Sequence, residues 1–123
     1  MTAVVPEAGP AGMLVGLRRA GYTVEQTGNF AVFDYVVEVG SRAGTAVRIG
    51  LELVPDWPLS APHGPHISPR QGHPHGAVHD SPLGPEWEHW SRPPADWAQD
   101  RTVRGYLRHL RTLFAQLENG PST

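Results

Sequence analysis

The chain has 123 residues, 39% of them hydrophobic, and a formal net charge of −2, which fits one domain with a modest core. It contains no cysteine, and this excludes disulfide bonds, thiolate metal sites and a cysteine nucleophile. The near-neutral charge gives no reason to expect a nucleic-acid or membrane partner. Without a long apolar run or a secretion signal at its start, we expect a cytoplasmic protein.

Residues 6–21 are expected to form an N-terminal helix. Pro10 suits the first helical turn, where its missing N–H is not needed, and Gly21 can end the helix. Apolar residues recur between them at helical spacing: Met13, Leu14, Leu17 and Ala20.

Three strands are expected next, joined by short turns. Residues 22–27 precede the tight-turn pair Gly28–Asn29, and residues 31–39 and 47–53 alternate apolar with other side chains. This alternation predicts an antiparallel meander with one apolar face and one solvated face.

The last helix is expected between an Asp100 N-cap and a stop at Gly120–Pro121. Its apolar residues form one stripe that can cover the apolar face of the sheet: Val103, Tyr106, Leu107, Leu110, Leu113, Phe114 and Leu117. Its other side carries four arginines, interpreted as a solvated face or as a surface for an acidic partner: Arg101, Arg104, Arg108 and Arg111. Helix, strands and covering helix together predict an α+β fold.

Residues 55–94 differ from both flanks, since they hold ten of the thirteen prolines and six of the seven histidines. Proline fixes φ and removes a hydrogen-bond donor, so we expect a long irregular segment in which only residues 65–69 are extended. Four tryptophans are expected to pin this segment to the core: Trp57, Trp87, Trp90 and Trp97.

The histidines suggest a metal site as one hypothesis, because imidazole and carboxylate groups bind zinc. The candidate ligands are His63, His66, His73, His75 and His79. Their spacing matches no established zinc pattern, and the simpler interpretation is a set of exposed or backbone-bonded loop histidines. His79, Asp80 and Ser81 are adjacent in the chain, but the members of a catalytic triad meet in space rather than in sequence.

Short motifs follow one another in the middle of the chain in a particular order. A Trp-Pro pair follows the third strand, a His-Pro-His follows a candidate fourth strand at residues 66–68, and a Trp-Ser-Arg precedes the last helix. The motif residues are Trp57, Pro58, His73, Pro74, His75, Trp90, Ser91, Arg92 and Trp97. From about residue 9 to residue 118 this order resembles the ubiquitin-conjugating enzyme (UBC) family, and it is similar to a bacterial branch associated with ubiquitin-like modification systems.

The resemblance implies a UBC-like α+β fold. Its parts would be an N-terminal helix, a four-stranded antiparallel meander, a long irregular segment rich in proline and histidine, and a C-terminal amphipathic helix packed on the sheet. Residues 1–123 would form a single domain, with flexible tails at residues 1–8 and 119–123. The catalytic cysteine of the family would fall near residues 81–85, where this chain has none, and the oxyanion-stabilising asparagine is replaced by His75.

A thioester relay is therefore excluded. The resemblance implies an adaptor or binding component of a bacterial ubiquitin-like pathway, with a ubiquitin-like protein or its activating enzyme as partner and no cofactor. One alternative is an active transferase. In it, His73, His75 or His79 would serve as acceptor or base, or Ser81 would form an oxyester, with Asp80 nearby. A second alternative is a histidine-rich metal-binding module.

Overall fold

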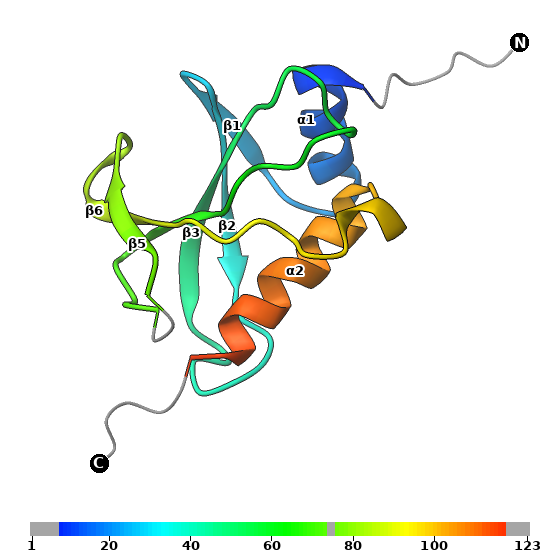
Figure 1. Ribbon diagram of the computed structural model, residues 1–123. Helices are drawn as coiled ribbons and strands as arrows, with labels where there is room; N and C mark the ends of the chain where they lie inside the picture. Colours follow the sequence, from blue (N-terminus) through cyan, green and yellow to red (C-terminus); the bar gives the residue numbers. More distant parts are fainter. Residues whose placement is uncertain (1–7, 74–75, 118–123) are drawn as a thin grey trace, which may run out of the picture.

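The computed structural model describes residues 8–73 and 76–117 (Figure 1). The elements in chain order are α1 (Gly9–Arg19), β1 (Val24–Thr27), β2 (Phe30–Val36), β3 (Ala46–Glu52), β4 (His66–Ser68), β5 (Val78–Ser81), β6 (Gly84–Trp90), the 3-10 helix η1 (Trp97–Gln99) and α2 (Val103–Ala115). The fold class is α+β, as the sequence predicts. No helix within these ranges is long and apolar enough to cross a membrane. The expected tails, apart from Ala8, lie outside the described residues.

All six strands belong to one antiparallel sheet with the order β1-β2-β3-β4-β6-β5. The first four strands therefore lie side by side in chain order, and β6 continues the sheet beyond β4. The register sets Phe33 beside Ile49 and Ile49 beside Ile67, so their side chains share one face.

The β5–β6 hairpin corrects the expectation of an irregular segment, and it gives the sheet two more strands than the four predicted. The pairing jumps from Asp80 opposite Glu88 to Ser81 opposite Gly84, which leaves Pro85 inside an irregularity. A proline is tolerated there because no ladder hydrogen bond needs its missing N–H. Pro82 in the hairpin turn and Pro85 in this irregularity thus do not prevent strand formation.

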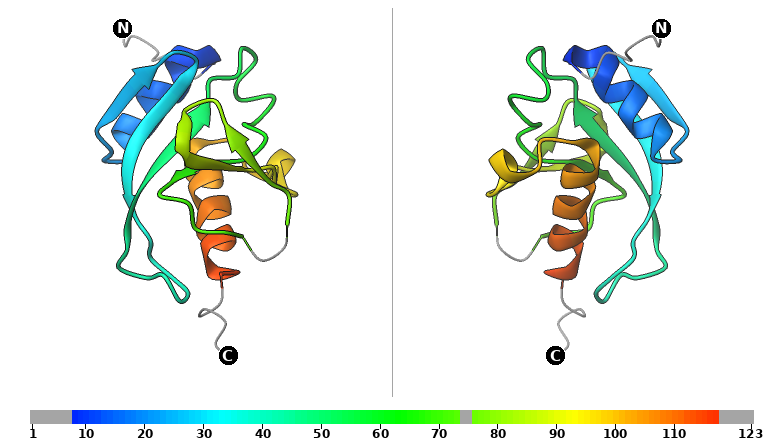
Figure 2. Two further views of the ribbon diagram at one scale, coloured as in Figure 1. Left: turned by 90° about the vertical axis from the view of Figure 1, so that its left-hand side faces the viewer. Right: turned by 90° about the vertical axis from the view of Figure 1, so that its right-hand side faces the viewer.

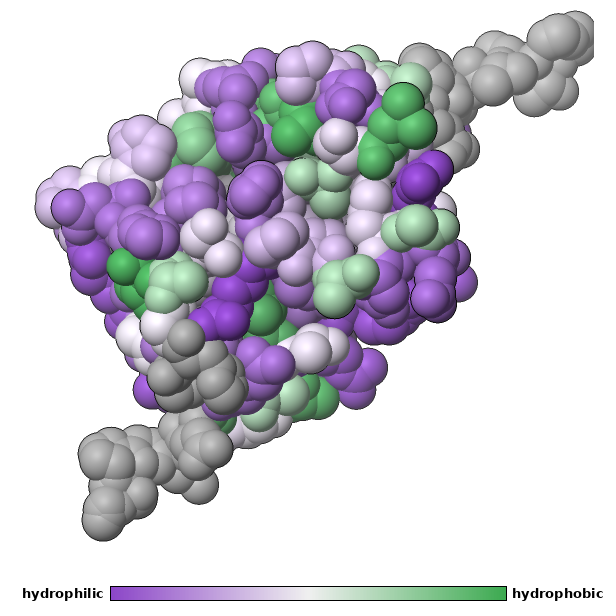
Figure 3. All heavy atoms as spheres, viewed as in Figure 1, coloured by the Kyte–Doolittle hydropathy of each residue, from purple (hydrophilic) through white to green (hydrophobic). Residues whose placement is uncertain are grey.

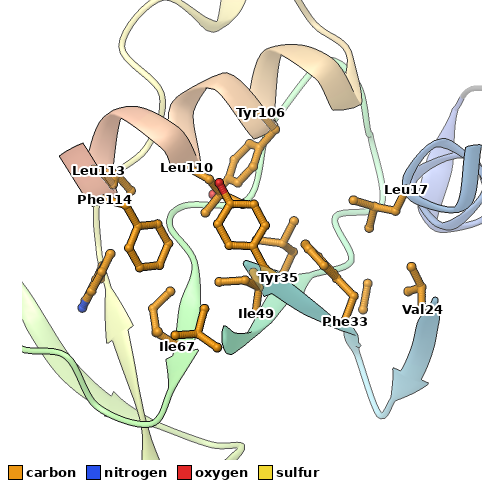
Figure 4. Close-up of a cluster of buried hydrophobic side chains, with 14 of the residues drawn as sticks. Leu17, Val24, Phe33, Tyr35, Ile49, Ile67, Tyr106, Leu110, Leu113 and Phe114 are labelled. Carbon is orange, nitrogen blue, oxygen red and sulfur yellow. The ribbon is translucent and has the colours of Figure 1, made fainter. Parts of the chain in front are cut away.

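The hydrophobic core lies between the sheet and α2, which runs along the face of β2 and β3 (Figure 2). Figure 4 shows Tyr35, Ile49 and Ile67 of the sheet pointing toward Leu110 and Phe114 of α2. The ring centroids of Tyr35 and Phe114 are 5.7 Å apart. The predicted stripe is confirmed, because its buried members are Tyr106, Leu110, Leu113, Phe114 and Leu117.

The N-cap of α2 is Thr102, not Asp100 as predicted. The Thr102 Oγ1 accepts a hydrogen bond from the Gly105 N–H at 3.0 Å and donates to Asp100 Oδ1 at 2.6 Å. A Cβ on Gly105 would lie 2.2 Å from the Asp100 carbonyl oxygen, so the chain needs glycine here. Asp100 thus orients the capping residue and leaves the helix N–H groups to Thr102.

Three of the four tryptophans pin the middle of the chain to the core as predicted. Trp57 and Trp90 are buried, and the Trp97 Nε1–H donates to the Pro58 carbonyl at 2.8 Å. Trp87 differs from these three, because its ring lies against Gly50 of β3.

Candidate functional site

Three histidines meet on the face of the sheet that points away from α2. Ile67 and Trp90 point into the core, so their neighbours His66 on β4 and His89 on β6 point to the opposite face. His89 pairs with His66 on one side and with His79 of β5 on the other. The sheet register therefore gathers what we call the histidine cluster, which consists of His66, His79 and His89.

Two rings of the histidine cluster are stacked, and the third is tilted against them. His66 and His89 are parallel within 2° with centroids 4.2 Å apart, and His79 follows with its centroid 6.1 Å from that of His89. The ring of Phe30 meets His66 edge-on at 4.8 Å. These contacts shield His66, whose exposed fraction is 5%.

Gly50 of β3 makes the cover over this face possible. A Cβ at this position would lie 2.6 Å from Cδ1 of Leu83, 3.5 Å from the Trp87 ring and 3.6 Å from the Cβ of His66. The side chains of the β5–β6 hairpin thus reach across β3, and the expectation of one fully solvated sheet face is wrong here. The physical reason is that the missing side chain of Gly50 leaves room for Leu83 and Trp87.

Ser81 contacts the histidine cluster directly. Its Oγ lies 2.7 Å from His66 Nδ1 and accepts a hydrogen bond from the Leu83 N–H at 3.1 Å. Burial first, and the neighbouring His89 second, lower the pKa of His66 from 6.5 to about 4. His66 is therefore neutral near pH 7, and in the tautomer that carries its proton on Nε2 the Ser81 hydroxyl donates to Nδ1. A neutral imidazole beside a hydroxyl is the arrangement that general-base activation of a serine requires.

His89 is also held in the neutral form. Burial lowers its pKa most, and His79 lowers it further, while the carboxylate of Glu52 raises it. The environment of the cluster thus opposes protonation of the two stacked rings, His66 and His89.

A metal ion does not fit this arrangement. The parallel rings of His66 and His89 direct their in-plane nitrogens side by side rather than toward one point. Over residues 8–73 and 76–117, no group of three or more His, Asp or Glu side chains could hold a metal ion. His63 is exposed, His73 is buried, and His75 lies outside the described ranges.

His73 belongs to the core side of the sheet and not to the histidine cluster. Its Nε2–H donates to the Leu113 carbonyl of α2 at 3.2 Å, and its ring meets Trp90 edge-on at 4.9 Å. Of the candidate acceptors or bases, His73 therefore does not lie beside Ser81, because the sheet separates them.

Asp80 alternates with His79 and Ser81 along β5. Its side chain is 97% exposed and lies 3.4 Å from the Arg70 guanidinium. As a member of a strand it points to the face opposite its two neighbours, so it does not complete a triad with Ser81.

Sequence reasoning missed Glu88, the most buried carboxylate among the described residues. Its Oε2 accepts three hydrogen bonds, from the N–H of Gln71 and of Gly72 at 2.7 Å each and from the Trp90 Nε1–H at 2.8 Å. The exposed fraction of Glu88 is 2%. The available signal was its alternation with Trp90, which places both side chains on the core face of β6.

The Trp-Ser-Arg motif connects β6 to the rest of the fold. The Ser91 N–H donates to the Ala77 carbonyl at 2.9 Å, and Arg92 Nη2 donates to the Gly76 carbonyl at 3.0 Å. The Arg92 carbonyl in turn accepts from His109 Nε2 of α2 at 2.6 Å. These contacts give the motif a positioning role, while Pro74 lies outside the described residues.

Two surface grooves flank α2, and neither is lined by the histidine cluster. The larger, of about 540 Å³, lies between α1 and the start of α2. The second, of about 500 Å³, lies between residues 92–96 and the outer side of α2. The surrounding surface is mainly hydrophilic, with hydrophobic residues scattered over it (Figure 3).

No family model matches the chain, nor does any curated protein or solved structure.

Proposed function

We propose that the chain is a UBC-like domain without a catalytic cysteine, which acts as an adaptor or binding component of a bacterial ubiquitin-like modification pathway. The observation that supports this proposal most is the order of the parts: a helix, four neighbouring antiparallel strands followed by the β5–β6 hairpin, and a final helix that covers one face of the sheet. The Trp-Ser-Arg motif begins at the last residue of β6 and precedes that helix, which is the order that the resemblance implies.

The region expected to hold the nucleophile of the family favours binding over thioester chemistry. Residues 81–85 run from β5 through the hairpin turn into β6, and they contain no cysteine. The chain also has no lysine, so it offers no side-chain amine that could become an acceptor. A domain of this kind would hold a partner without being modified.

The test combines binding with intact mass. The purified protein is incubated with ATP, a bacterial ubiquitin-like protein and its activating enzyme. We expect saturable binding to one of these proteins in calorimetry and an unchanged mass of the chain. If the chain bound neither protein, or if it formed a covalent adduct, the adaptor proposal would be contradicted.

One specific contact favours a second candidate, the oxyester-forming transferase. His66 Nδ1 lies 2.7 Å from Ser81 Oγ and is positioned to take the hydroxyl proton. In this reaction Ser81 Oγ would bond to the acyl carbon of a thioester held by the activating enzyme. The C–S bond would break, and His66 would pass its proton to the departing thiolate.

The transferase makes a distinct prediction for the same incubation. It requires an adduct that hydroxylamine removes, that Ser81→Ala abolishes, and that the control Ser60→Ala retains, since Ser60 is exposed and its hydroxyl donates to Asp56. An adduct that persists in Ser81→Ala would exclude this serine as the acceptor.

A further inference from the structure

The larger groove combines a basic rim with an apolar floor. The rim carries Arg19 from α1 together with Arg101, Arg104 and Arg108 from the start of α2. Four of the ten basic residues of a chain with net charge −2 thus surround one groove. Such a concentration creates a local positive potential that the overall charge does not reveal.

The positive charge of the rim is largely unneutralised. Among the residues that the structure describes, Asp100 is the one acidic residue that lines the groove, and its Oδ2 is already 2.9 Å from Nη2 of Arg108. None of the ion pairs among the described residues includes Arg19, Arg101 or Arg104. All three of these arginines are exposed, so their guanidinium groups remain available to a partner.

The floor is formed where the two helices approach closely. A Cβ on Gly16 of α1 would lie 2.5 Å from Cγ2 of Val103 on α2. The buried Gly12 and Trp57, with the half-buried Val15 and Val103, complete this floor. The groove is therefore held open by rigid secondary structure, which favours a preformed site.

The chemistry of the groove distinguishes between classes of ligand. Single-stranded nucleic acids bind by stacking bases on accessible aromatic faces in addition to phosphate contacts. The one aromatic residue of this groove is Trp57, and it is 4% exposed. A free phosphate would use the arginines but not the apolar floor. A peptide with both carboxylate and aliphatic side chains would use both.

We propose that this groove docks an acidic, amphipathic segment of a protein partner. Carboxylates of the segment pair with Arg19, Arg101 and Arg104, and aliphatic side chains pack on Val15 and Val103. The inference rests on the proposed binding role of the domain, but it does not depend on the pathway to which the partner belongs.

The test measures fluorescence anisotropy with a fluorescein-labelled synthetic peptide of alternating glutamate pairs and single leucines. A polyglutamate peptide, a peptide with lysine in place of glutamate, and an oligothymidylate serve as comparison probes. We expect the glutamate–leucine peptide to bind most tightly and its affinity to fall as salt is added, because exposed charge pairs are screened. If polyglutamate bound as tightly as the glutamate–leucine peptide, the proposed contribution of the apolar floor would be wrong. If oligothymidylate bound more tightly than that peptide, the proposal of a protein partner would be wrong.

Matched variants locate the site. Arg19→Ala combined with Arg104→Ala should weaken peptide binding by about tenfold, since each exposed charge contact contributes a few-fold. Arg111→Ala is the control on the same helix, because Arg111 does not line the groove, and it should change affinity by less than about twofold. Equal losses in both variants, or no loss in the double variant, would refute the proposal. The synthetic peptide contains no ubiquitin-like protein, so failure of the pathway assay would leave this result unchanged.

Discussion

Lowering the pH should destabilise the fold through His66. Its folded-state pKa of about 4 lies below the unfolded value of 6.5, so the unfolded chain binds more protons between these limits. The stability that the neutral ring contributes to the folded state is therefore fully present above pH 6.5. It is lost as the pH falls from 6.5 toward 4. A tenfold change in proton affinity corresponds to about 1.4 kcal/mol, so the lowering of the pKa from 6.5 to about 4 sets an upper limit of about 3.4 kcal/mol for this group.

The groups that face His66 determine how the experiment is read. Phe30 and Ser81 do not titrate in this range, but His89 does, and its lowered pKa adds a loss of the same sign. The informative quantity is therefore the difference between wild type and His66→Gln, which removes one titrating ring while retaining a polar side chain.

Urea unfolding followed by tryptophan fluorescence, at several values between about pH 4.5 and pH 7.5, measures this difference. The free energy of unfolding of wild type should fall by roughly 2–3 kcal/mol more than that of His66→Gln. His63→Gln is the control, because His63 is exposed, and it should follow wild type. Parallel curves for wild type and His66→Gln would refute the conclusion that burial keeps this ring neutral.

Three further substitutions test the packing and the caps by chemical denaturation. Leu110→Ala should cost about 2–5 kcal/mol, because this fully buried side chain fills the centre of the α2 interface, and a loss under 1 kcal/mol would place α2 elsewhere. Glu88→Ala should cost roughly 3 kcal/mol or more, since three donors lose their shared acceptor, whereas Glu88→Gln keeps one acceptor oxygen and should cost less. Thr102→Ala should cost about 1 kcal/mol, while Thr102→Ser should be nearly neutral, and equal losses would remove the case for a cap.

Hydrophobic periodicity predicted most of the scaffold. The strands expected at residues 22–27, 31–39 and 47–53 correspond to β1, β2 and β3 within a few residues at each end. The extended element expected at residues 65–69 contains β4. These segments alternate apolar and other side chains because one face packs on α2, and such a pattern can be read without tertiary information.

The β5–β6 hairpin could not be predicted in the same way. Its outward side chains include His79 and His89, and its inward ones include Glu88, so the alternation does not separate apolar from polar residues. The inward carboxylate is stabilised by donors from residues 71 and 72, which local sequence does not reveal. Tertiary hydrogen bonding overrides the local pattern in this part of the sheet.

The contact between His66 and Ser81 was also beyond sequence reasoning. The two residues are 15 positions apart, and they meet because β4 and β5 both flank β6. Ser81 itself was a predicted site residue, but its expected companions were the histidines nearest in sequence. The order of the strands in the sheet, rather than distance along the chain, places His66 beside Ser81.

A single carboxylate oxygen of Glu88 joins residues 71–72 to β6 and, through the Trp90 ring, to α2. It holds the backbone of Gln71 and Gly72 against the indole of Trp90, whose ring packs on Phe114 of α2. Opening this segment would leave a charge without its donors inside the protein. The amide protons of Gln71 and Gly72 should therefore exchange with solvent only when the whole domain unfolds, although they lie in a connection outside any helix or strand.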